Sequence, residues 1–294
     1  MSRQFRTVAL VGKYQSPEVA SAVLAIAEFC RGRGLAVWVE AQTAQSTQVA
    51  DQFPVKDYEA IGLGADLAIV LGGDGTLLLT ARRLARFTVP LVGVNQGHLG
   101  FLTDIGRDDA VERLEGLLNG RYAEEQRSLL DAEVLRDGQR IHQTLAMNDV
   151  VVNKGDVGRM IEFDVRINGE FVYTQRSDGM IVTTPTGSTA YAMSSNGPIL
   201  HPQVPAIALV PLCPHALTAR PVTLPDDCRI EMVLRAPHDG RVHFDGQEHV
   251  DLKAGDLVRV ARSAHRVALL HPEGYSYFAM LREKLHWSSL PRPY

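Results

Sequence analysis

Five consecutive apolar residues, Leu67–Leu71, run directly into the sequence Gly-Gly-Asp-Gly at positions 72–75. An apolar run of this length predicts a strand that is buried on both faces, which is typical of a parallel sheet. The residues that follow, Thr76–Leu84, are mostly good helix formers. The stretch therefore predicts a strand, a glycine-rich turn and a helix N-terminus in direct succession.

The predicted turn has the features of an anion-binding site to which one carboxylate has been added. Glycines allow backbone N–H groups to approach a phosphate closely, and the helix dipole favours negative charge at this end. Asp74 alone would repel a phosphate, so its presence indicates phosphoryl transfer, in which a metal ion or an abstracted proton brings the two together. The alternative is an ordinary strand-to-helix turn in which Asp74 caps the helix.

Before Tyr122 the chain alternates between predicted strands and predicted helices. Besides the central strand and helix, the predicted elements are strands at Thr7–Val11, Ala36–Glu40 and Thr88–Val94 and helices at Pro17–Arg31 and Asp108–Leu118. Between them, the polar residues Gln42–Val55 predict a loop or an irregular helix. This alternation predicts an α/β domain with an open, mostly parallel sheet. Ligands of such sheets bind beyond the carboxyl ends of the strands, where Asp74 and Asn95 are expected.

After Tyr122 the hydrophobic pattern changes to a period of two, which is typical of strands. Predicted strands lie at Leu129–Leu135, His142–Asn153, Ile161–Ile167, Glu170–Arg176, Met180–Thr184, Arg229–Leu234, Val242–Asp245, His249–Leu252 and Leu257–Val260. Asp-Gly at 137–138 and Asn-Gly at 168–169 are strong hairpin signals. This region predicts a mainly β, sandwich-like domain.

The two patterns predict two domains. We expect an α/β domain at residues 1–121 and a β-rich domain at residues 122–271. Tyr275–Trp287 predict a short helix with aromatic anchors, and we expect residues 272–294 to pack back on the α/β domain.

Composition and cysteine usage narrow the class of protein. The 294 residues carry a formal net charge of −4, which gives no general attraction to nucleic acid or to anionic membranes. No apolar run reaches the length of a membrane span, and the first residues lack the pattern of a signal peptide. Cys30, Cys213 and Cys228 lack metal-binding spacing, so we expect buried free thiols in a cytoplasmic protein.

The glycines at 62 and 64 begin like a dinucleotide-binding fingerprint, but Leu67 stands where the third glycine belongs, so we do not assign that motif here.

A second cluster of polar residues follows the predicted strand Met180–Thr184. The sequence Pro-Thr-Gly-Ser-Thr at 185–189 predicts a turn, with Ser188 placed to cap a short helix at Thr189–Ser194. Small hydroxyls, backbone donors and the ring of Tyr191 form a surface suited to a nucleoside. The alternative is an ordinary hydroxyl-rich loop.

Asn148 and Asp149 form a polar pair inside an otherwise apolar predicted strand. The polar atoms of such a pair must either form hydrogen bonds within the protein or serve a function. Both side chains are able to bind ribose hydroxyls or the edge of adenine. A bulge or a strand end is the alternative. Arg159 and Arg176 are candidate phosphate ligands, although arginines on strands are more often simply solvated.

These motifs together resemble those of bacterial NAD kinases. The matching segments, in family order, are Gly72-Gly73-Asp74-Gly75, Asn95-x-Gly97-x-Leu99-Gly100-Phe101-Leu102, Asn148-Asp149, Ser177-Asp178-Gly179, Pro185-Thr186-Gly187-Ser188-Thr189-Ala190-Tyr191, Asp245-Gly246-Gln247 and the tail Tyr275-Ser276-Tyr277-Phe278. The glycine-Asp turn is shared with diacylglycerol and sphingosine kinases and resembles one in phosphofructokinases. The hydroxyl-rich segment and the Asn-Asp pair select NAD kinase.

The resemblance implies transfer of a phosphoryl group from ATP to the adenosine 2′-hydroxyl of NAD, with a divalent metal, usually Mg²⁺. Asp74 would be the general base, and Gly72, Gly73 and Gly75 would cradle phosphates. The dinucleotide site in the β-rich domain would comprise Asp74, Gly75, Asn148, Asp149, Arg159, Arg176, Asp178, Thr186, Thr189, Ala190, Tyr191, Ala192, Met193, Ser194 and Gln247, with Tyr191 stacking on a ring. The metal ligands are not implied. The resemblance also implies a homo-oligomer, either a homodimer or a homotetramer. No nucleic acid or membrane partner is expected.

Two departures from the family pattern stand out. Asp149 occupies the position of the usual Glu and reaches about one methylene less far, and Asn196-Gly197-Pro198 replaces the frequent Gly-Gly-Pro. Two other functions fit the glycine-Asp turn: a diacylglycerol-type lipid kinase and a non-catalytic dinucleotide sensor. The hydroxyl-rich loop argues against the first, and Asp74 argues against the second. Polyphosphate in place of ATP, NADH in place of NAD, and feedback by NADP or NADPH stay open at this point.

Overall fold

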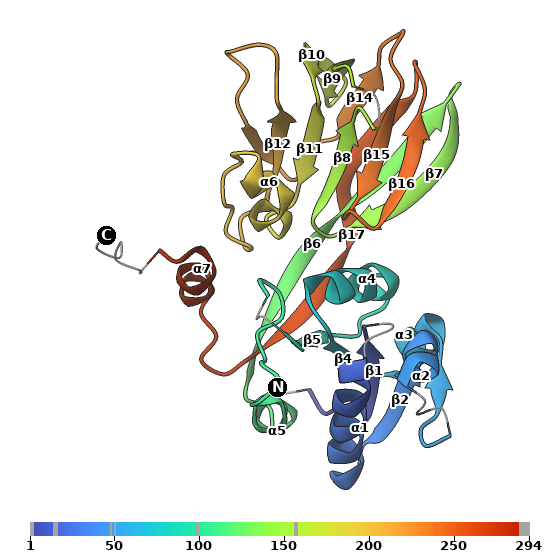
Figure 1. The fold of residues 1–294 in the computed structure, drawn as a ribbon, viewed down its shortest axis with the longest axis vertical. Coiled ribbons are helices and arrows are strands. Elements are labelled where there is room, and N and C mark those ends of the chain that lie inside the picture. Colours follow the sequence, from blue (N-terminus) through green and yellow to red (C-terminus); the bar gives the residue numbers. More distant parts are fainter. Residues whose placement is uncertain are drawn as a thin grey trace. The chain divides into compact units, whose positions relative to one another are not determined.

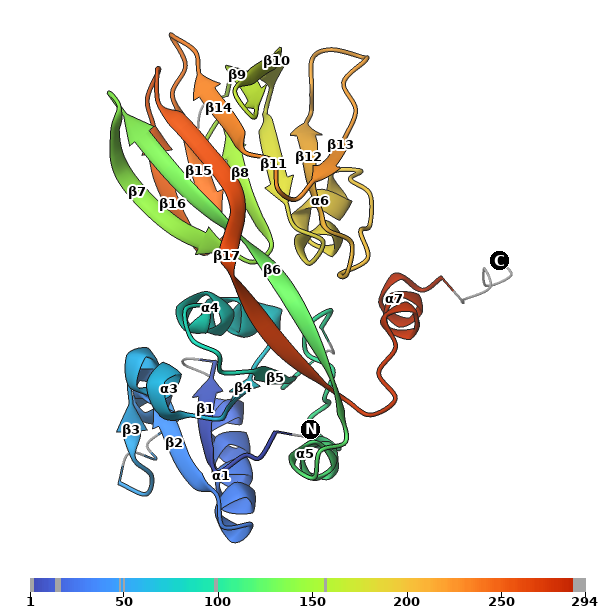
Figure 2. The ribbon, with the colours of Figure 1, turned by 180° about the vertical axis from the view of Figure 1, so that it is seen from behind.

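A computed structural model describes residues 3–13, 17–47, 49, 51–97, 100–155 and 158–287. The chain forms two compact units (Figure 1). Unit 1 comprises the described residues up to Gln126 and those from Val267 onward, and unit 2 is Arg127–Arg266. The chain passes between the units within two long strands, β6 (Tyr122–Arg136) and β17 (Leu257–Pro272), which pair with each other (Figure 2).

Unit 1 contains the parallel sheet that the sequence predicts. Its strands, in spatial order, are β3 (Val55–Lys56), β2 (Ala36–Glu40), β1 (Thr7–Gly12), β4 (Leu67–Leu71), β5 (Leu91–Val94) and the end of β17. Every pair along this order is parallel. All five residues of β4 are fully buried, as expected for a strand covered on both faces.

Along the chain, the helices of unit 1 are α1 (Pro17–Gly32), α2 (Ala41–Thr47), α3 (Tyr58–Gly64), α4 (Asp74–Leu84), α5 (Ala110–Leu118) and, near the end, α7 (Tyr277–Leu285). Alternate residues of β4, beginning with Leu67, share one core cluster with α1, α2 and α5. The central strand, turn and helix and the tail helix therefore form as predicted.

Two helices of unit 1, α2 and α3, lie in stretches for which no regular helix was predicted. Residues 41–47 form α2, because the Glu40 carboxylate accepts hydrogen bonds from the backbone N–H groups of Gln42 and Thr43 at 3.1 and 2.9 Å. The glycines at 62 and 64 lie in α3, where a side chain would meet Phe87 and Trp38. They are packing glycines of a helix and form no phosphate loop.

Unit 2 is a sandwich of two sheets. One sheet contains β10 (Glu170–Ser177), β9 (Ile161–Ile167), β14 (Ile230–Leu234) and the first part of β17, with β6 and β7 (Gln139–Ala146) alongside. The other has the order β13 (Val222–Pro225), β12 (Ala206–Leu212), β11 (Gly179–Thr183), β8 (Asp149–Asn153), β15 (Gly240–Phe244) and β16 (Glu248–Leu252). One core cluster joins residues of both sheets, including Phe163 and Phe244, which confirms the mainly β prediction.

Tight turns join strands of the sandwich, and one predicted strand is divided into two. Asp137, Gly138, Asn168 and Gly169 all have positive φ, as type I′ hairpin turns require. The predicted strand 142–153 is divided, because β7 ends at Ala146 in one sheet and β8 begins at Asp149 in the other. The polar pair therefore marks a strand end, where the chain changes sheets.

A short helix, α6 (Tyr191–Ser194), follows the 3₁₀ turn η1 (Gly187–Thr189) on the outer face of the second sheet. Ala192 of α6 is fully buried and packs with Ile181 and Val210 of the sheet. The backbone cap of α6 is Ala190, so the prediction that Ser188 caps this helix is wrong. The Ser188 hydroxyl instead donates to the Pro185 carbonyl and accepts from the Leu200 N–H, at 2.6 and 2.9 Å.

The cysteine prediction is correct for two of the three residues. Cys30 and Cys228 are buried free thiols, but Cys213 is exposed and has a positive φ of 43°. Burial raises the pKa of the Cys30 thiol to about 12, which makes it unreactive at neutral pH.

In the described chain, every helix is too short or too polar to cross a membrane.

Candidate functional site

The glycine-rich turn of unit 1 joins the end of β4 to the start of α4. Gly73 is the N-cap of α4 and has an extended backbone, and Asp74 is the first helical residue. The structure thus contradicts the alternative in which Asp74 caps the helix. A side chain at Gly72 would lie 2.5 Å from Thr76 Oγ1, whereas nothing lies within 4 Å of the position for one at Gly73. Gly73 therefore leaves open space beside the helix N-terminus, where an anion is favoured.

The carboxylate of Asp74 is held by the loop that follows β5. Its Oδ2 accepts from the Phe101 N–H at 2.8 Å, and its Oδ1 accepts from the Leu102 N–H at 3.1 Å. The Thr103 hydroxyl lies 3.2 Å from Oδ1 and links Asp74 to the side chain of Asn95. Asp74 and Asn95 thus lie at the same edge of the sheet, two hydrogen bonds apart. Leu99 of the predicted motif lies outside the described residues.

In unit 2, Asn148 and Asp149 are fixed by the turn after β15. The Asp245 carboxylate accepts the backbone N–H groups of Met147, Asn148 and Asp149 at 2.9, 2.7 and 3.1 Å. Asn148 Oδ1 is buried and has no hydrogen-bond partner among the described residues. A buried acceptor without a donor is costly, so this oxygen indicates a place where a ligand donates a hydrogen bond.

Asp149 is a buried acid beside another carboxylate. It is 5% exposed, and burial, with the negative charge of Asp245 second, raises the pKa of its carboxyl to about 7. Near neutral pH, Asp149 therefore exists partly as a carboxylic acid, which donates as well as accepts a hydrogen bond.

A small hollow of unit 2 opens over the Asn-Asp pair. It has a volume of about 330 Å³. It is lined by Asn148, Asp149, Val151, Asn153, Ala190, Tyr191, His243, Asp245 and Gly246. Tyr191 is 48% exposed. Burial, followed by the charges of His249 and Arg241, lowers the pKa of His243. Two polar side chains, a neutral imidazole and an aromatic face are suited to a purine ring.

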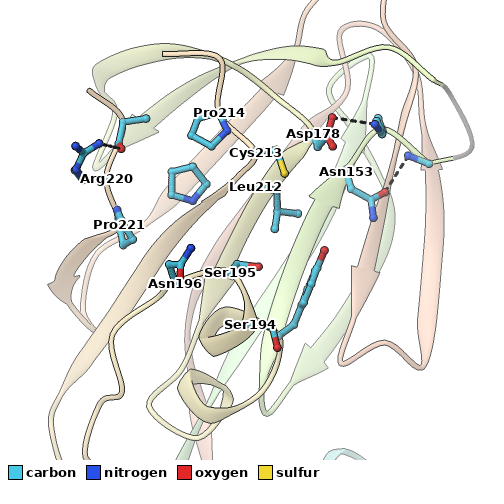
Figure 3. Close-up of a pocket in the computed structure, with 15 residues that line it drawn as sticks. Asn153, Asp178, Ser194, Ser195, Asn196, Leu212, Cys213, Pro214, Arg220 and Pro221 are labelled. Atoms are coloured by element: carbon cyan, nitrogen blue, oxygen red, sulfur yellow. Dashed lines mark hydrogen bonds and ion pairs between the residues drawn. The ribbon is translucent and has the colours of Figure 1, made fainter. Parts of the chain in front are cut away.

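A second, larger pocket has a volume of about 670 Å³ (Figure 3). It shares the lining residues Asn153 and Tyr191 with the small hollow. Asp178 lines the pocket and is paired with Lys154, whose Nζ lies 2.9 Å from Asp178 Oδ1. Ser194 and the exposed Cys213 line it as well. Both hollows lie within unit 2.

The predicted binding residues divide into those that line these hollows and those that do not. Asn148, Asp149, Asp178, Ala190, Tyr191 and Ser194 line them. Thr186 and Thr189 are buried, and Thr186 Oγ1 lies 3.3 Å from Nη1 of the buried Arg127. Ala192 belongs to the core. Arg159, Arg176 and Gln247 are exposed and line neither hollow, and Met193 is half-buried.

Sequence reasoning missed three residues near these sites: Thr103, Arg127 and Lys154. Thr103 directly follows the glycine-rich motif at residues 95–102, and this adjacency is the sequence signal that could have identified it. Lys154 directly follows the strand that begins with the Asn-Asp pair. Nothing in the sequence distinguishes Arg127 from other arginines on strands.

Across the described chain, no group of three or more His, Cys, Asp or Glu side chains is gathered to hold a metal ion. In phosphoryl-transfer enzymes generally, Mg²⁺ commonly binds through substrate phosphates and waters, with only one or two protein carboxylates.

Comparison with known proteins identifies the class that this fold and these residues define. The family model of the ATP-NAD kinase N-terminal domain matches residues 8–122. That of the ATP-NAD kinase C-terminal domain matches residues 147–271. The two models cover most of the chain and correspond to its α/β and β-rich parts, so the protein is a two-domain phosphotransferase.

Relatives along the whole chain identify the family. The chain is 70% identical to the NAD kinase of Aromatoleum aromaticum over 292 residues, which are 99% of this chain and 97% of that protein. It is 68% identical to the NAD kinase of an Azoarcus species, covering 99% of both. The chain belongs to the NAD kinase family.

Solved structures support the fold. The crystal structure of yeast NADH kinase complexed with NADH has a TM-score of 0.90 at 25% identity, covering 99% of this chain and 91% of that one. The NAD kinase from Archaeoglobus fulgidus in complex with ATP has a TM-score of 0.74 at 24% identity, covering 95% and 98%.

Proposed function

We propose that this protein transfers the γ-phosphoryl group of ATP to the adenosine 2′-hydroxyl of NAD, giving ADP and NADP. Membership of the NAD kinase family supports the reaction. One observation supports the mechanism. Asp74 is the first residue of helix α4 and follows Gly73, which leaves open space beside the helix N-terminus. The half-buried carboxylate of Asp74 accepts hydrogen bonds from two backbone N–H groups and one hydroxyl.

In the proposed mechanism, Asp74 is the general base. Its carboxylate accepts the proton of the 2′-hydroxyl while that oxygen forms a bond to the γ-phosphorus. The bond from the γ-phosphorus to the bridging oxygen breaks, and the electron pair leaves with ADP. Gly72, Gly73 and Gly75 let the backbone of the turn approach the phosphates, whose charge the N-terminus of α4 stabilises.

Unit 2 binds and orients NAD in this proposal, and unit 1 carries the catalytic turn. Asn148 Oδ1 accepts a hydrogen bond from the adenine amino group or from a ribose hydroxyl, which supplies its missing donor. Asp149 binds the same nucleoside, and Tyr191 stacks on a ring. The proposed dinucleotide-binding residues are Asp74, Gly75, Asn148, Asp149, Arg159, Arg176, Asp178, Thr186, Thr189, Ala190, Tyr191, Ala192, Met193, Ser194 and Gln247.

The phosphate donor enters as the Mg²⁺ complex of ATP in this proposal. The metal neutralises the developing charge on the phosphates, and protein positioning supplies the rest. ATP is the proposed donor in preference to polyphosphate, with Arg176 near the donor phosphates. We also propose that the protein works in the cytoplasm as a homodimer or homotetramer.

The experiment is an assay of NADP formation by the purified protein with Mg²⁺, NAD and either ATP or polyphosphate. We expect NADP with ATP, no product from a diacylglycerol dispersion, and loss of turnover with EDTA. Asp74→Asn is the control for the chemistry: it keeps the fold and NAD binding, and its kcat falls by roughly 10²- to 10⁴-fold. NAD binding without NADP formation by the wild-type protein would instead indicate a sensor.

A further inference from the structure

Thr103 lies at the centre of a hydrogen-bond network around Asp74. Its fully buried Oγ1 accepts from Asn95 Nδ2 at 2.8 Å and from the Gly100 N–H at 3.2 Å. A hydroxyl oxygen has two acceptor lone pairs and one hydrogen. Because Asn95 and Gly100 use both lone pairs, the hydrogen points to Asp74 Oδ1, which lies 3.2 Å away. Thr103 is therefore the donor in its contact with the carboxylate.

Packing fixes Thr103 in this orientation. A side chain at Gly93 of β5 would lie 2.7 Å from Thr103 Cγ2, so the strand carries a glycine where the methyl group rests. A side chain at Gly100 would lie 1.9 Å from Asp74 Oδ1 and 2.5 Å from Thr103 Oγ1. Two glycines thus make room for this one contact, and the methyl group restricts rotation of the Thr103 side chain.

The contacts distinguish the two oxygens of Asp74. Oδ1 accepts two hydrogen bonds, from the Leu102 N–H and from Thr103, whereas Oδ2 accepts one, from the Phe101 N–H. Each carboxylate oxygen has two lone pairs. Oδ2 therefore keeps one lone pair for another donor. In the described chain, Asp74 forms no ion pair, so neutral donors alone hold its charge.

We infer that Thr103 is a positioning residue for phosphoryl transfer: its fixed hydroxyl saturates Oδ1 of Asp74 and directs the proton of the substrate alcohol to Oδ2. This inference rests on the proposed role of Asp74 as general base. The Thr103 hydrogen bond stabilises the ionised carboxylate and orients it, so Asp74 is ready to accept a proton. Thr103 contacts neither substrate nor reacting atoms in this account.

Thr103→Val tests the inference, because valine keeps the shape and removes the hydroxyl. We expect kcat to fall by roughly tenfold to a hundredfold, with KM for NAD and for ATP within twofold. The acid limb of the pH profile of kcat should move to higher pH, because the ionised carboxylate has lost a donor. A purely structural role for Thr103 would not move this limb. Thr103→Ser keeps the hydroxyl and should restore most of kcat and the wild-type limb.

Thr103→Cys serves if the valine variant does not fold, since a thiol is a weaker donor of similar size. We expect it to move the acid limb in the same direction by a smaller amount. A wild-type kcat and pH profile in a folded Val or Cys variant would overturn the inference. Asp74→Asn is measured in parallel. If it keeps wild-type turnover, the base role itself fails; if it loses turnover while Thr103→Val does not, only the role of Thr103 fails.

Discussion

Asp245 Oδ1 accepts a hydrogen bond from the backbone N–H of Asn148 at 2.7 Å. The contact lies where the chain leaves β7 in one sheet of unit 2 and enters β8 in the other. The same carboxylate binds the N–H groups of the residues on either side. One side chain thus fixes the backbone that presents the Asn-Asp pair.

Removing the Asp245 carboxylate should destabilise unit 2. In Asp245→Ala, three backbone N–H groups lose their acceptor, and we expect the free energy of unfolding to fall by about 2–4 kcal/mol. Asp245→Asn keeps one acceptor oxygen and should cost clearly less. Urea unfolding followed by circular dichroism measures both variants. An alanine variant as stable as wild type would show that these hydrogen bonds contribute nothing net.

Asp149 should make stability depend on pH. The pKa of its carboxyl is raised from 3.8 to about 7 in the folded protein, so the folded state holds a proton that the unfolded state has lost between these values. Stability from this group is therefore fully present below pH ~4, falls as pH rises, and is constant above ~7. When the pH is raised from 5 to 7.5, the free energy of unfolding of the wild type should fall by about 2–3 kcal/mol more than that of Asp149→Asn.

Urea unfolding at both pH values gives this comparison. The asparagine variant is the matched control, because it has the same shape and no titrating group. Equal pH dependence in the two proteins would mean that Asp149 is ionised in the folded state throughout this range.

The two adjacent glycines of the turn should respond differently to alanine. Gly72→Ala places a methyl group 2.5 Å from Thr76 Oγ1, and we expect a loss of about 1–3 kcal/mol in unfolding free energy. Gly73→Ala meets nothing within 4 Å, so stability should change by less than about 0.5 kcal/mol. The same methyl group would obstruct phosphate, so KM for ATP should rise several-fold. Stability loss in Gly73→Ala with unchanged KM would contradict this assignment.

Lys154 should affect NAD binding through Asp178. The pair is partly exposed, so Lys154→Met should change stability by no more than about 1 kcal/mol. Without its partner, Asp178 is free to turn away from the larger pocket, and we expect KM for NAD to rise while kcat changes little. Arg140→Met is the control, because it removes a comparable contact, 2.9 Å from Glu133, outside both hollows. A similar KM change in both variants would exclude a specific role for Lys154.

The sequence predicted features that depend on local pattern. The buried run before Gly72 and the Asn-Gly turn at 168–169 each carry a strong signal, and both formed as expected. Helix α2 was uncertain because its residues are polar and its cap is the side chain of Glu40, the last residue of the preceding strand. The run Ala206–Leu212 forms the buried strand β12, although we assigned it no element.

Tertiary contacts determined the features that local pattern did not predict. The chain changes sheets at Asn148 because Asp245, nearly a hundred positions further on, binds its backbone. Ser188 does not cap the predicted helix, because Leu200 donates to its hydroxyl from across the loop. The role of Thr103 depends on contacts with Asn95 and Asp74, which are adjacent only in the folded sheet.

The most direct test of the proposed chemistry is the distance from the adenosine 2′-oxygen to Asp74 Oδ2 in a crystal structure of the protein with NAD and a non-hydrolysable ATP analogue. We predict a separation of about 2.6–3.2 Å, or one bridging water. An alcohol well beyond this reach, with neither water nor ion between it and the acid, would contradict the account.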